Sequence, residues 1–223
     1  MVELVLASAS PARLATLRAA GINPVVLVAG VDEAAVLARA LAADPALDPA
    51  GQVLVLARAK AEAAAPLAPA DALVLGCDSM LELDGEALGK PTGPADAKRR
   101  IRQQAGRAAV LRTGHWLCGP SPAPGAGQGR RRGEGAASST VVRFGQMTDA
   151  EIDAYVATGE PLQVAGAFTI DGLGGPFVEG VDGDPHGVVG LSLPLLRHLL
   201  NRFGLGVTDL WRPGPGGSGA TTA

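Results

Sequence analysis

The stretch at residues 4–21, which reads LVLASASPARLATLRAAG, decides how the chain begins to fold. A short β-prone run ends at two serines, and Pro11 then opens an amphipathic helix that ends near Gly21. Ser10 suits the N-cap of this helix, proline its first turn, and glycine the position just past its end. The unpaired N–H groups of the helix and the serine hydroxyls would therefore meet at the end of a strand, with the charge of Arg13 one turn away. Because such a point binds anions, the stretch predicts a phosphate-binding site.

The composition excludes several classes of protein. A net charge of −3 and an aromatic content of 3 % argue against a nucleic-acid binder. Cys77 and Cys118 form no disulfide framework, which indicates reduced thiols in a cytosolic protein, and the scattered His115, His186 and His198 indicate no zinc site. The sequence shows neither an apolar run long enough for a membrane span nor a signal peptide. We therefore expect a cytoplasmic protein that binds neither nucleic acid nor membrane.

Strand and helix patterns alternate along the chain and predict a mixed α/β (α+β) fold. The expected helices cover residues 11–21, 33–43, 52–65, 94–104, 149–157 and 193–203, and the expected strands cover residues 2–6, 25–29, 72–77, 108–118, 138–144, 167–170 and 176–181. Asp84-Gly85, between two apolar segments, predicts a hairpin. A hairpin inside an alternating pattern favours a mixed sheet over a strictly doubly wound parallel one.

One segment breaks this alternation. Residues 119–136 are rich in Pro, Gly and Ser and contain the run Arg130-Arg131-Arg132, which we interpret as a solubilising loop rather than a nucleic-acid patch. We predict a single domain over residues 1–207, with two lobes and a flexible insertion at 119–136. Residues 208–223 are predicted to form a disordered tail.

Asp78 is the strongest candidate for chemistry. It directly follows the apolar run at residues 72–77, and functional groups in α/β proteins gather at the carboxyl ends of strands. A carboxylate there can hold Mg²⁺ or orient a water molecule, whereas a lone aspartate in this place would merely cap a turn.

Three further charged residues also have a structural and a functional interpretation. Glu33 follows the predicted N-cap Asp32, where it would complement the helix dipole. Lys60 shares the apolar stripe of its helix, so its ammonium group either reaches the surface or enters a cleft. Lys90 lies between a glycine and a proline, which leave its side chain exposed and well positioned.

These residues belong to segments that occur in the order found in one enzyme family. The segments are Ala7-Ser8-Ala9-Ser10-Pro11-Ala12-Arg13, Val31-Asp32-Glu33, Leu56-Ala57-Arg58-Ala59-Lys60-Ala61, Gly76-Cys77-Asp78-Ser79 with Gly89-Lys90-Pro91, Gly159-Glu160-Pro161 with Ala165-Gly166-Ala167-Phe168, and Gly183-Asp184 with Val189-Gly190-Leu191. Over residues 2–203, interrupted by the 119–136 insertion, the chain resembles the Maf family of nucleoside triphosphate pyrophosphatases.

The resemblance implies an elongated two-lobed α/β fold with a central cleft, similar to the inosine-triphosphatase type, and a homodimer. It implies hydrolysis of a nucleoside triphosphate, non-standard or pyrimidine, between the α and β phosphates, with Mg²⁺ or Mn²⁺ as cofactor. The implied phosphate-binding residues are Ser8, Ser10, Arg13, Lys60 and Lys90, the implied metal ligands are Glu33 and Asp78, and the implied catalytic residues are Asp78 as the base, Glu33, Lys60 and Lys90.

Two questions remain open at the level of sequence. Ala12, Ser79 and Asp171 match no single base-specificity pattern of the family, so the preferred base is not predicted. The alternative function is a nucleotide-binding regulator of cell division that acts through a protein partner. Loss of the motif carboxylates would favour that alternative, and both carboxylates are present.

Overall fold

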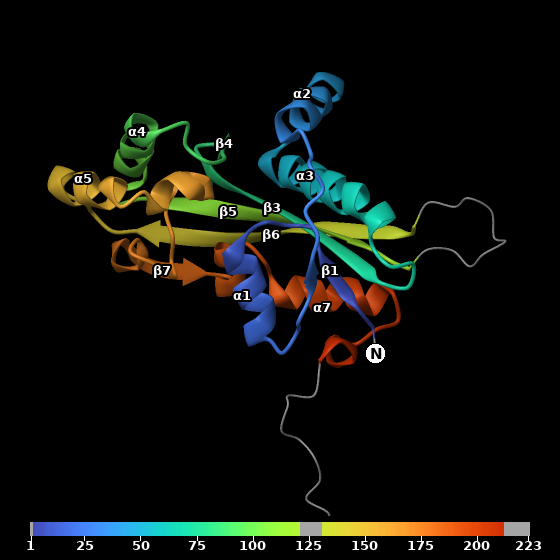
Figure 1. Cartoon of the computed structure of the whole chain (residues 1–223). Helices are drawn as coiled ribbons and strands as arrows, with labels where there is room; N and C mark the ends of the chain where they lie inside the picture. Colours follow the sequence, from blue (N-terminus) through green and yellow to red (C-terminus); the bar gives the residue numbers. More distant parts are fainter. Residues whose placement is uncertain (1, 121–130, 212–223) are drawn as a thin grey trace, which may run out of the picture.

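The computed structural model describes residues 2–120 and 131–211 (Figure 1). Residues 121–130 of the predicted insertion, which include Arg130, lie outside the described residues. The same holds for residues 212–223 of the predicted tail. Within the described residues, no helix is both long enough and apolar enough to cross a membrane.

A single mixed sheet organises the fold. Its strands are β1 (Leu4–Leu6), β2 (Val25–Val26), β3 (Leu73–Leu83), β4 (Glu86–Leu88), β5 (Ala108–Cys118), β6 (Gly133–Phe144) and β7 (Val178–Asp182). They are arranged in the order β2-β1-β3-β5-β6-β7, and β4 pairs with β3. The β1 strand is parallel to β2 and β3, whereas all other pairings are antiparallel. The predicted mixed α/β fold is confirmed.

Helices lie on both sides of this sheet. They are α1 (Pro11–Ala19), α2 (Glu33–Ala43), α3 (Pro49–Ala64), α4 (Pro94–Gln104), α5 (Asp149–Ala157), α6 (Pro185–Val189) and α7 (Leu193–Arg202). The α3 helix covers one face, with α2 projecting beyond it, while α1 and α7 lie on the other face (Figure 1). A large core under α7 joins β1, β3 and β5 through leucines such as Leu6, Leu75 and Leu117.

Two glycines allow α3 to lie directly against the sheet. A Cβ atom on Gly76 of β3 would lie 2.2 Å from the carbonyl oxygen of Ala57, and one on Gly114 of β5 would lie 2.3 Å from that of Val53. Both distances are far below van der Waals contact, so any side chain at either glycine would push the helix away. This close approach fixes the height of α3 above the centre of β3.

Local signals predicted where three of the helices begin. Ser10 caps α1 and Asp32 caps α2 through side-chain oxygens that accept backbone N–H groups, and Thr148 and Glu151 form a capping box at α5. Asp84 and its following glycine both have positive φ, as a two-residue hairpin turn requires.

The strand predictions were less accurate. The β3 strand does not end before Asp78 but runs on to Leu83, because β5 pairs with it along that whole length. The expected strand at residues 167–170 is absent: a 3₁₀ turn at Ala165–Ala167 leads into irregular backbone. The β2 strand is limited to Val25–Val26.

The described parts of the predicted insertion and tail are ordered, which corrects those boundaries. The β6 strand begins at Gly133 rather than at residue 138 and pairs with β5 from there on. The guanidinium of Arg131 donates to the carbonyl oxygens of Ala72 at 2.7 Å and Pro69 at 2.8 Å, so this arginine is a structural contact. At the other end, Trp211 forms a β-bridge with Ile22.

A buried histidine links the sheet to α7. The Nδ1 atom of His115 lies 3.0 Å from the carbonyl oxygen of Thr113, and its Nε2 atom accepts the backbone N–H of Ser192, the N-cap of α7, at 2.8 Å. The ring is therefore neutral, with its proton on Nδ1. Burial lowers the pKa of His115 from 6.5 to about 4.

This pKa predicts a loss of stability in mild acid. Between pH 6.5 and about 4 the unfolded chain binds a proton at this histidine and the folded protein does not, so the free energy of unfolding falls as pH falls. We expect a slope of up to about 1.4 kcal/mol per pH unit from this group. In urea unfolding, His115→Gln should flatten the pH dependence of the free energy of unfolding. An unchanged slope in His115→Gln would contradict the assignment.

Candidate active site

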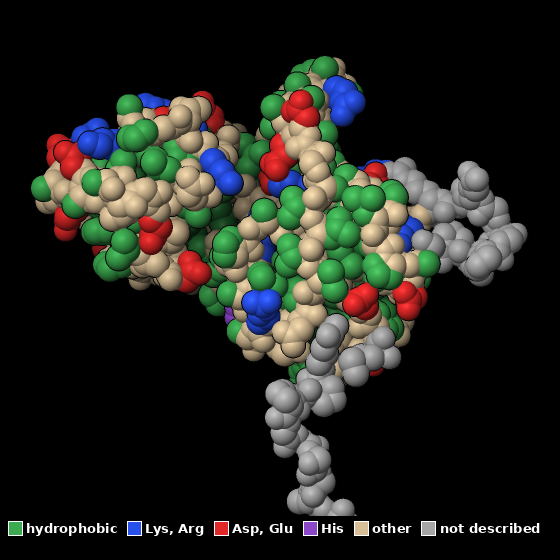
Figure 2. Space-filling model, in the orientation of Figure 1, with side chains coloured by type: hydrophobic (Ala, Val, Ile, Leu, Met, Phe, Trp, Pro, Cys, Tyr) green, Lys and Arg blue, Asp and Glu red, His purple; other side chains and the backbone are tan. Residues whose placement is uncertain are grey.

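All of the predicted site residues line one cleft of about 710 Å³. They are Ser8, Ser10, Arg13, Glu33, Lys60, Asp78 and Lys90. Figure 2 shows the hollow between the part of the molecule that carries α4 and α5 and the part that carries α2 and α3. The volume falls in the range of small-molecule sites.

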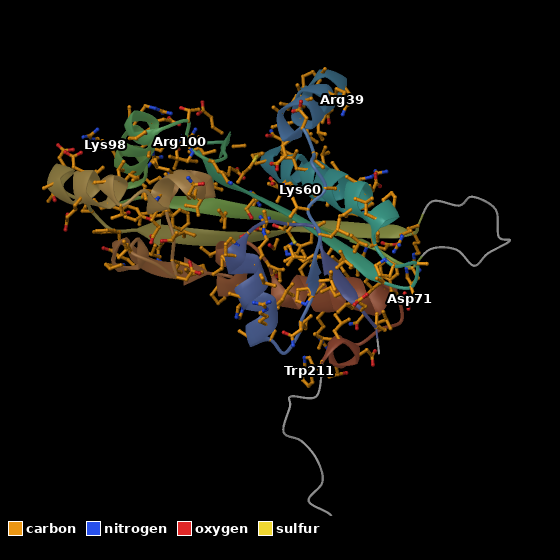
Figure 3. The ribbon with its side chains drawn as sticks, viewed as in Figure 1. Arg39, Lys60, Asp71, Lys98, Arg100 and Trp211 are labelled. Atoms are coloured by element: carbon orange, nitrogen blue, oxygen red, sulfur yellow. The ribbon has the colours of Figure 1, made fainter. Side chains whose placement is uncertain are left out.

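The centre of the cleft holds a lysine between two carboxylates. The Nζ atom of Lys60 lies 2.6 Å from Oδ1 of Asp78 and 3.0 Å from Oε1 of Glu33. Figure 3 labels Lys60 on α3, the helix whose height above the sheet the two glycines set. The side chain of Asp78 is 10 % exposed and that of Glu33 is 52 % exposed. Asp78 is therefore held in place, whereas Glu33, at the start of α2, faces solvent.

Burial changes the acidity of two neighbours on β3. It raises the pKa of Asp78 above its ordinary value, because the favourable charges of Lys60 and Arg13 only partly offset the loss of hydration. Burial likewise raises the pKa of Cys77 to about 11, so the Cys77 thiol stays protonated and is no nucleophile at neutral pH. Of these two neighbours, Asp78 is the one suited to exchange a proton with a substrate or with water.

The guanidinium of Arg13 already forms hydrogen bonds within the protein. Its Nε donates to the carbonyl oxygen of Gly190 at 2.8 Å, its Nη1 donates to that of Cys77 at 2.8 Å and to Oγ of Ser8 at 3.0 Å, and its Nη2 donates to Oγ of Ser79 at 3.0 Å. These bonds use four of the five N–H groups of a guanidinium. Arg13 therefore joins α1, β3 and the end of α6, and has one N–H left for a ligand.

The hydrogen bond from Arg13 to Ser79 is the first of a series in which each hydroxyl donates to the next acceptor. The hydroxyl of Thr113 donates to the carbonyl oxygen of Gly187 at 3.0 Å, so the hydroxyl of Ser79, 3.0 Å away, must donate to Thr113. Sequence motifs did not indicate Thr113 or the glycine carbonyls, because these partners are far from Arg13 along the chain. Because side chains alternate along a strand, Asp78 faces α3 while Ser79 faces α1.

The two serines of the first motif keep their protons for a ligand. Oγ of Ser8 accepts the N–H of Ser10 at 3.3 Å and the Nη1 donor of Arg13, and Oγ of Ser10 accepts the N–H of Arg13 at 3.4 Å. In all of these bonds the hydroxyl is the acceptor. Within the described residues, both hydroxyl protons thus remain free to donate into the cleft beside the N-terminus of α1.

Lys90 enters the cleft from the α4 side. The carbonyl oxygen of the preceding Gly89 accepts Nη1 of Arg100 at 2.8 Å and the N–H of Gly166 at 3.1 Å. Figure 3 labels Arg100 on α4. The backbone at Gly89 is therefore fixed, while the Lys90 side chain is exposed.

The carboxylate pair fits a divalent cation with oxygen preference. Oxygens of Glu33 and Asp78 already surround one positive charge, the ammonium of Lys60. Carboxylate oxygens are the ligands that Mg²⁺ and Mn²⁺ prefer. Among the described residues, no three His, Cys, Asp or Glu side chains come together as a metal-binding group. A metal held by this pair would therefore take its remaining ligands from water or from a substrate.

The rest of the cleft is chemically different. Leu111, Phe168, Ile170 and Val188, which pack in one hydrophobic cluster, form what we call the apolar wall. Gln163, Thr169 and Asp171 also line the cleft. The sequence pattern did not indicate this wall, because its members come from β5, α6 and the irregular segment around residue 168. The cleft can thus hold a ligand with one anionic and one flat, less polar part.

The bonds of Arg13 predict that it stabilises the fold. Arg13→Lys keeps the charge but loses the fork that reaches Gly190, Cys77, Ser8 and Ser79 together, so we expect the free energy of unfolding to fall by about 2–4 kcal/mol. Urea unfolding measures this loss. Replacement of the exposed Arg18 on the same helix by Lys is the matched control and should change stability little; equal effects of the two changes would contradict the assignment.

Comparisons with known proteins agree with the motifs. The family model described as Maf-like protein matches residues 3–203. A protein of Streptomyces coelicolor named nucleoside triphosphate pyrophosphatase is 54 % identical over 212 residues, 95 % of each chain. A protein of Salinispora tropica with the same name is 55 % identical over 217 residues, 95 % of this chain and 88 % of its own. Among solved structures, the Ham1 protein of Staphylococcus aureus aligns with 64 % of this chain and 71 % of its own, at 18 % identity and a TM-score of 0.38. The match of the family model over nearly the whole chain, together with relatives at this level of identity, shows that the chain belongs to the Maf-like protein family.

Proposed function

We propose that this protein is a nucleoside triphosphate pyrophosphatase, which hydrolyses its substrate between the α and β phosphates and yields a nucleoside monophosphate and pyrophosphate. The observation that carries the proposal is Lys60 between Glu33 and Asp78, in a cleft with anion donors on two sides. The name borne by relatives at 50–55 % identity supports the same reaction.

The triphosphate would bind among the positive charges and free hydroxyl protons. Ser8, Ser10 and the N-terminus of α1 offer donors on one side, and Lys90 offers a positive charge on the other. The ammonium of Lys60 would exchange contacts with the carboxylates for contacts with phosphate oxygens. Because the pentavalent transition state and the leaving pyrophosphate both concentrate negative charge, these groups stabilise the reaction electrostatically.

Asp78 would act as the general base. Its pKa is raised by burial, so the carboxylate holds a proton more readily than an exposed aspartate does. It would take a proton from a water molecule whose oxygen attacks the α phosphorus. The bond from the α phosphorus to the bridging oxygen then breaks, and pyrophosphate leaves with the electron pair.

We propose Mg²⁺ or Mn²⁺ as the cofactor, held by Glu33 and Asp78 together with substrate oxygens. When bound, the metal would supply Lewis acidity toward phosphate oxygens. Lys60 pairs with both carboxylates, so a metal that arrives with the triphosphate is favoured, because the phosphates give the lysine a new partner. A cytoplasmic location and a homodimer remain predictions, and we include both in the proposal. No observation within the described residues favours the alternative of a regulator that acts through a protein partner.

The reaction is tested by incubating the purified protein with each common nucleoside triphosphate, Mg²⁺ or Mn²⁺ and water enriched in oxygen-18. We expect monophosphate and pyrophosphate in equal amounts, with the heavy oxygen in the monophosphate because water attacks the α phosphorus. Mass spectrometry of both products gives the answer. Release of a diphosphate and inorganic phosphate, or label in the pyrophosphate, would contradict the proposed bond cleavage.

The role of Asp78 is tested by Asp78→Asn, which keeps the size of the side chain and removes its charge. Turnover should fall by about two or more orders of magnitude. Asp153→Asn is the matched control, because Asp153 also pairs with a lysine at 2.6 Å but lies on α5, and it should leave turnover unchanged. Near-normal turnover in folded Asp78→Asn protein would exclude Asp78 as the base.

A further inference from the structure

An irregular segment supplies much of the cleft wall beside the apolar residues. Residues 168–174 form neither helix nor strand, yet Phe168, Thr169, Ile170 and Asp171 all line the cleft. A segment without a backbone ladder must be held in place by other contacts. In this chain those contacts converge on a single carboxylate that does not line the cleft.

That carboxylate belongs to Glu160. Its Oε2 accepts the N–H of Leu173 at 3.1 Å, and its Oε1 accepts the N–H of Gly174 at 3.2 Å and the hydroxyl of Thr169. One side chain thus closes the segment into a loop by binding both of its ends. The hydroxyl of Tyr155 on α5 adds a fourth contact, since it accepts the N–H of Thr169 at 3.1 Å.

The packing leaves this loop little freedom. A Cβ atom on Gly174 would lie 2.5 Å from both the hydroxyl oxygen of Tyr155 and the carbonyl oxygen of Thr169, so the backbone passes directly over the tyrosine. Burial of Glu160 is outweighed by its bonds from Thr169, Leu173 and Gly174, which lower the pKa of Glu160. At neutral pH the carboxylate is therefore charged and acts only as an acceptor.

Phe168 and Ile170 of this segment pack with Leu111 and Val188 and so belong to the apolar wall of the cleft. The charged residues Lys60 and Asp78 come from α3 and β3, whereas residues 168–171 lie among the apolar wall. A triphosphate held at the charged residues leaves this wall to the nucleobase. If the proposed function holds, the position of residues 169–171 decides which polar edges a base meets.

We propose that Glu160 is a positioning residue for base selection: it holds residues 169–171 against the cleft and thereby sets the preference among nucleoside triphosphates, without touching the substrate. The phosphate-binding groups do not depend on it, because Glu160 takes part in none of the hydrogen bonds that position Ser8, Ser10, Lys60 and the backbone before Lys90. A variant that frees the loop should therefore change the preference among nucleoside triphosphates while it leaves phosphate binding unchanged.

Glu160→Gln tests this separation, because it keeps the shape but turns an amide group toward backbone N–H donors. In hydrogen exchange, the amides of Leu173 and Gly174 should lose protection. The ratio of kcat/KM between the best and the worst of the common nucleoside triphosphates should change at least tenfold. The Kd of inorganic tripolyphosphate, which has no base, should stay within twofold of the wild-type value.

Glu151→Gln is the matched control in the same part of the molecule. The carboxylate of Glu151 accepts the N–H and the hydroxyl of Thr148, both at 2.7 Å, at the start of α5 and away from the cleft. We expect a similar loss of stability without a change in the substrate ratio. Should Glu160→Gln be too unstable to purify, Tyr155→Phe removes the acceptor of the Thr169 N–H outside the cleft and should shift the ratio in the same direction.

The outcomes separate this proposal from the proposed function. If the wild-type protein hydrolyses no nucleoside triphosphate, the proposed function fails, and the same ratios measured as Kd values by equilibrium dialysis still decide the role of Glu160. If the wild-type protein is active and folded Glu160→Gln keeps its ratio, Glu160 is merely structural and the inference is overturned. Weaker tripolyphosphate binding in Glu160→Gln would also overturn it.

Discussion

The close approach of α3 to the sheet is the constraint on which the site depends. Without side chains at Gly76 and Gly114, the helix backbone contacts β3 and β5 directly, and Lys60 reaches the carboxylate of Asp78. A charged aspartate buried in the middle of a strand costs several kcal/mol of desolvation unless a partner compensates it. The lysine is that partner, so the glycines determine the electrostatics of the site as well as the packing of the core.

The alternation of β3 connects this lysine–carboxylate pair to a second network. Asp78 points to the α3 side, and the next residue, Ser79, points to the α1 side, where Arg13 and Thr113 bind it. Arg13 extends the network to Ser8 and to the carbonyl oxygen of Gly190. Two adjacent residues thus tie helices on opposite faces of the sheet to one cleft, and a shift of β3 by a single residue would exchange the two networks.

The sequence predicted what depends on local chemistry. The caps at Ser10 and Asp32 and the Asp84-Gly85 turn depend on contacts over a few residues. The site residues that the family motifs predicted all line one cleft. It did not predict the continuation of β3 through Asp78, because a polar pair in mid-strand resembles a strand end until its distant partners are known. For the same reason, residues 167–170 resembled a strand: their apolar character was visible, but the carboxylate of Glu160 that bends the segment was not assigned to it.

The contacts of Arg131 have a consequence for how the chain assembles. The carbonyl oxygens of Pro69 and Ala72 lie in the turn before β3. The guanidinium of Arg131, which precedes β6, binds both of them. Arg131 is separated from these carbonyl groups by β3, β4, α4 and β5 along the chain. The carbonyl groups therefore stay hydrated until this long loop has closed. During synthesis α3 can form early. The hydrogen bonds from Arg131 to the turn before β3 can form only after residue 131 has left the ribosome. Contacts of this range form late in folding, so the turn before β3 gains its last hydrogen bonds from a residue that does not line the cleft.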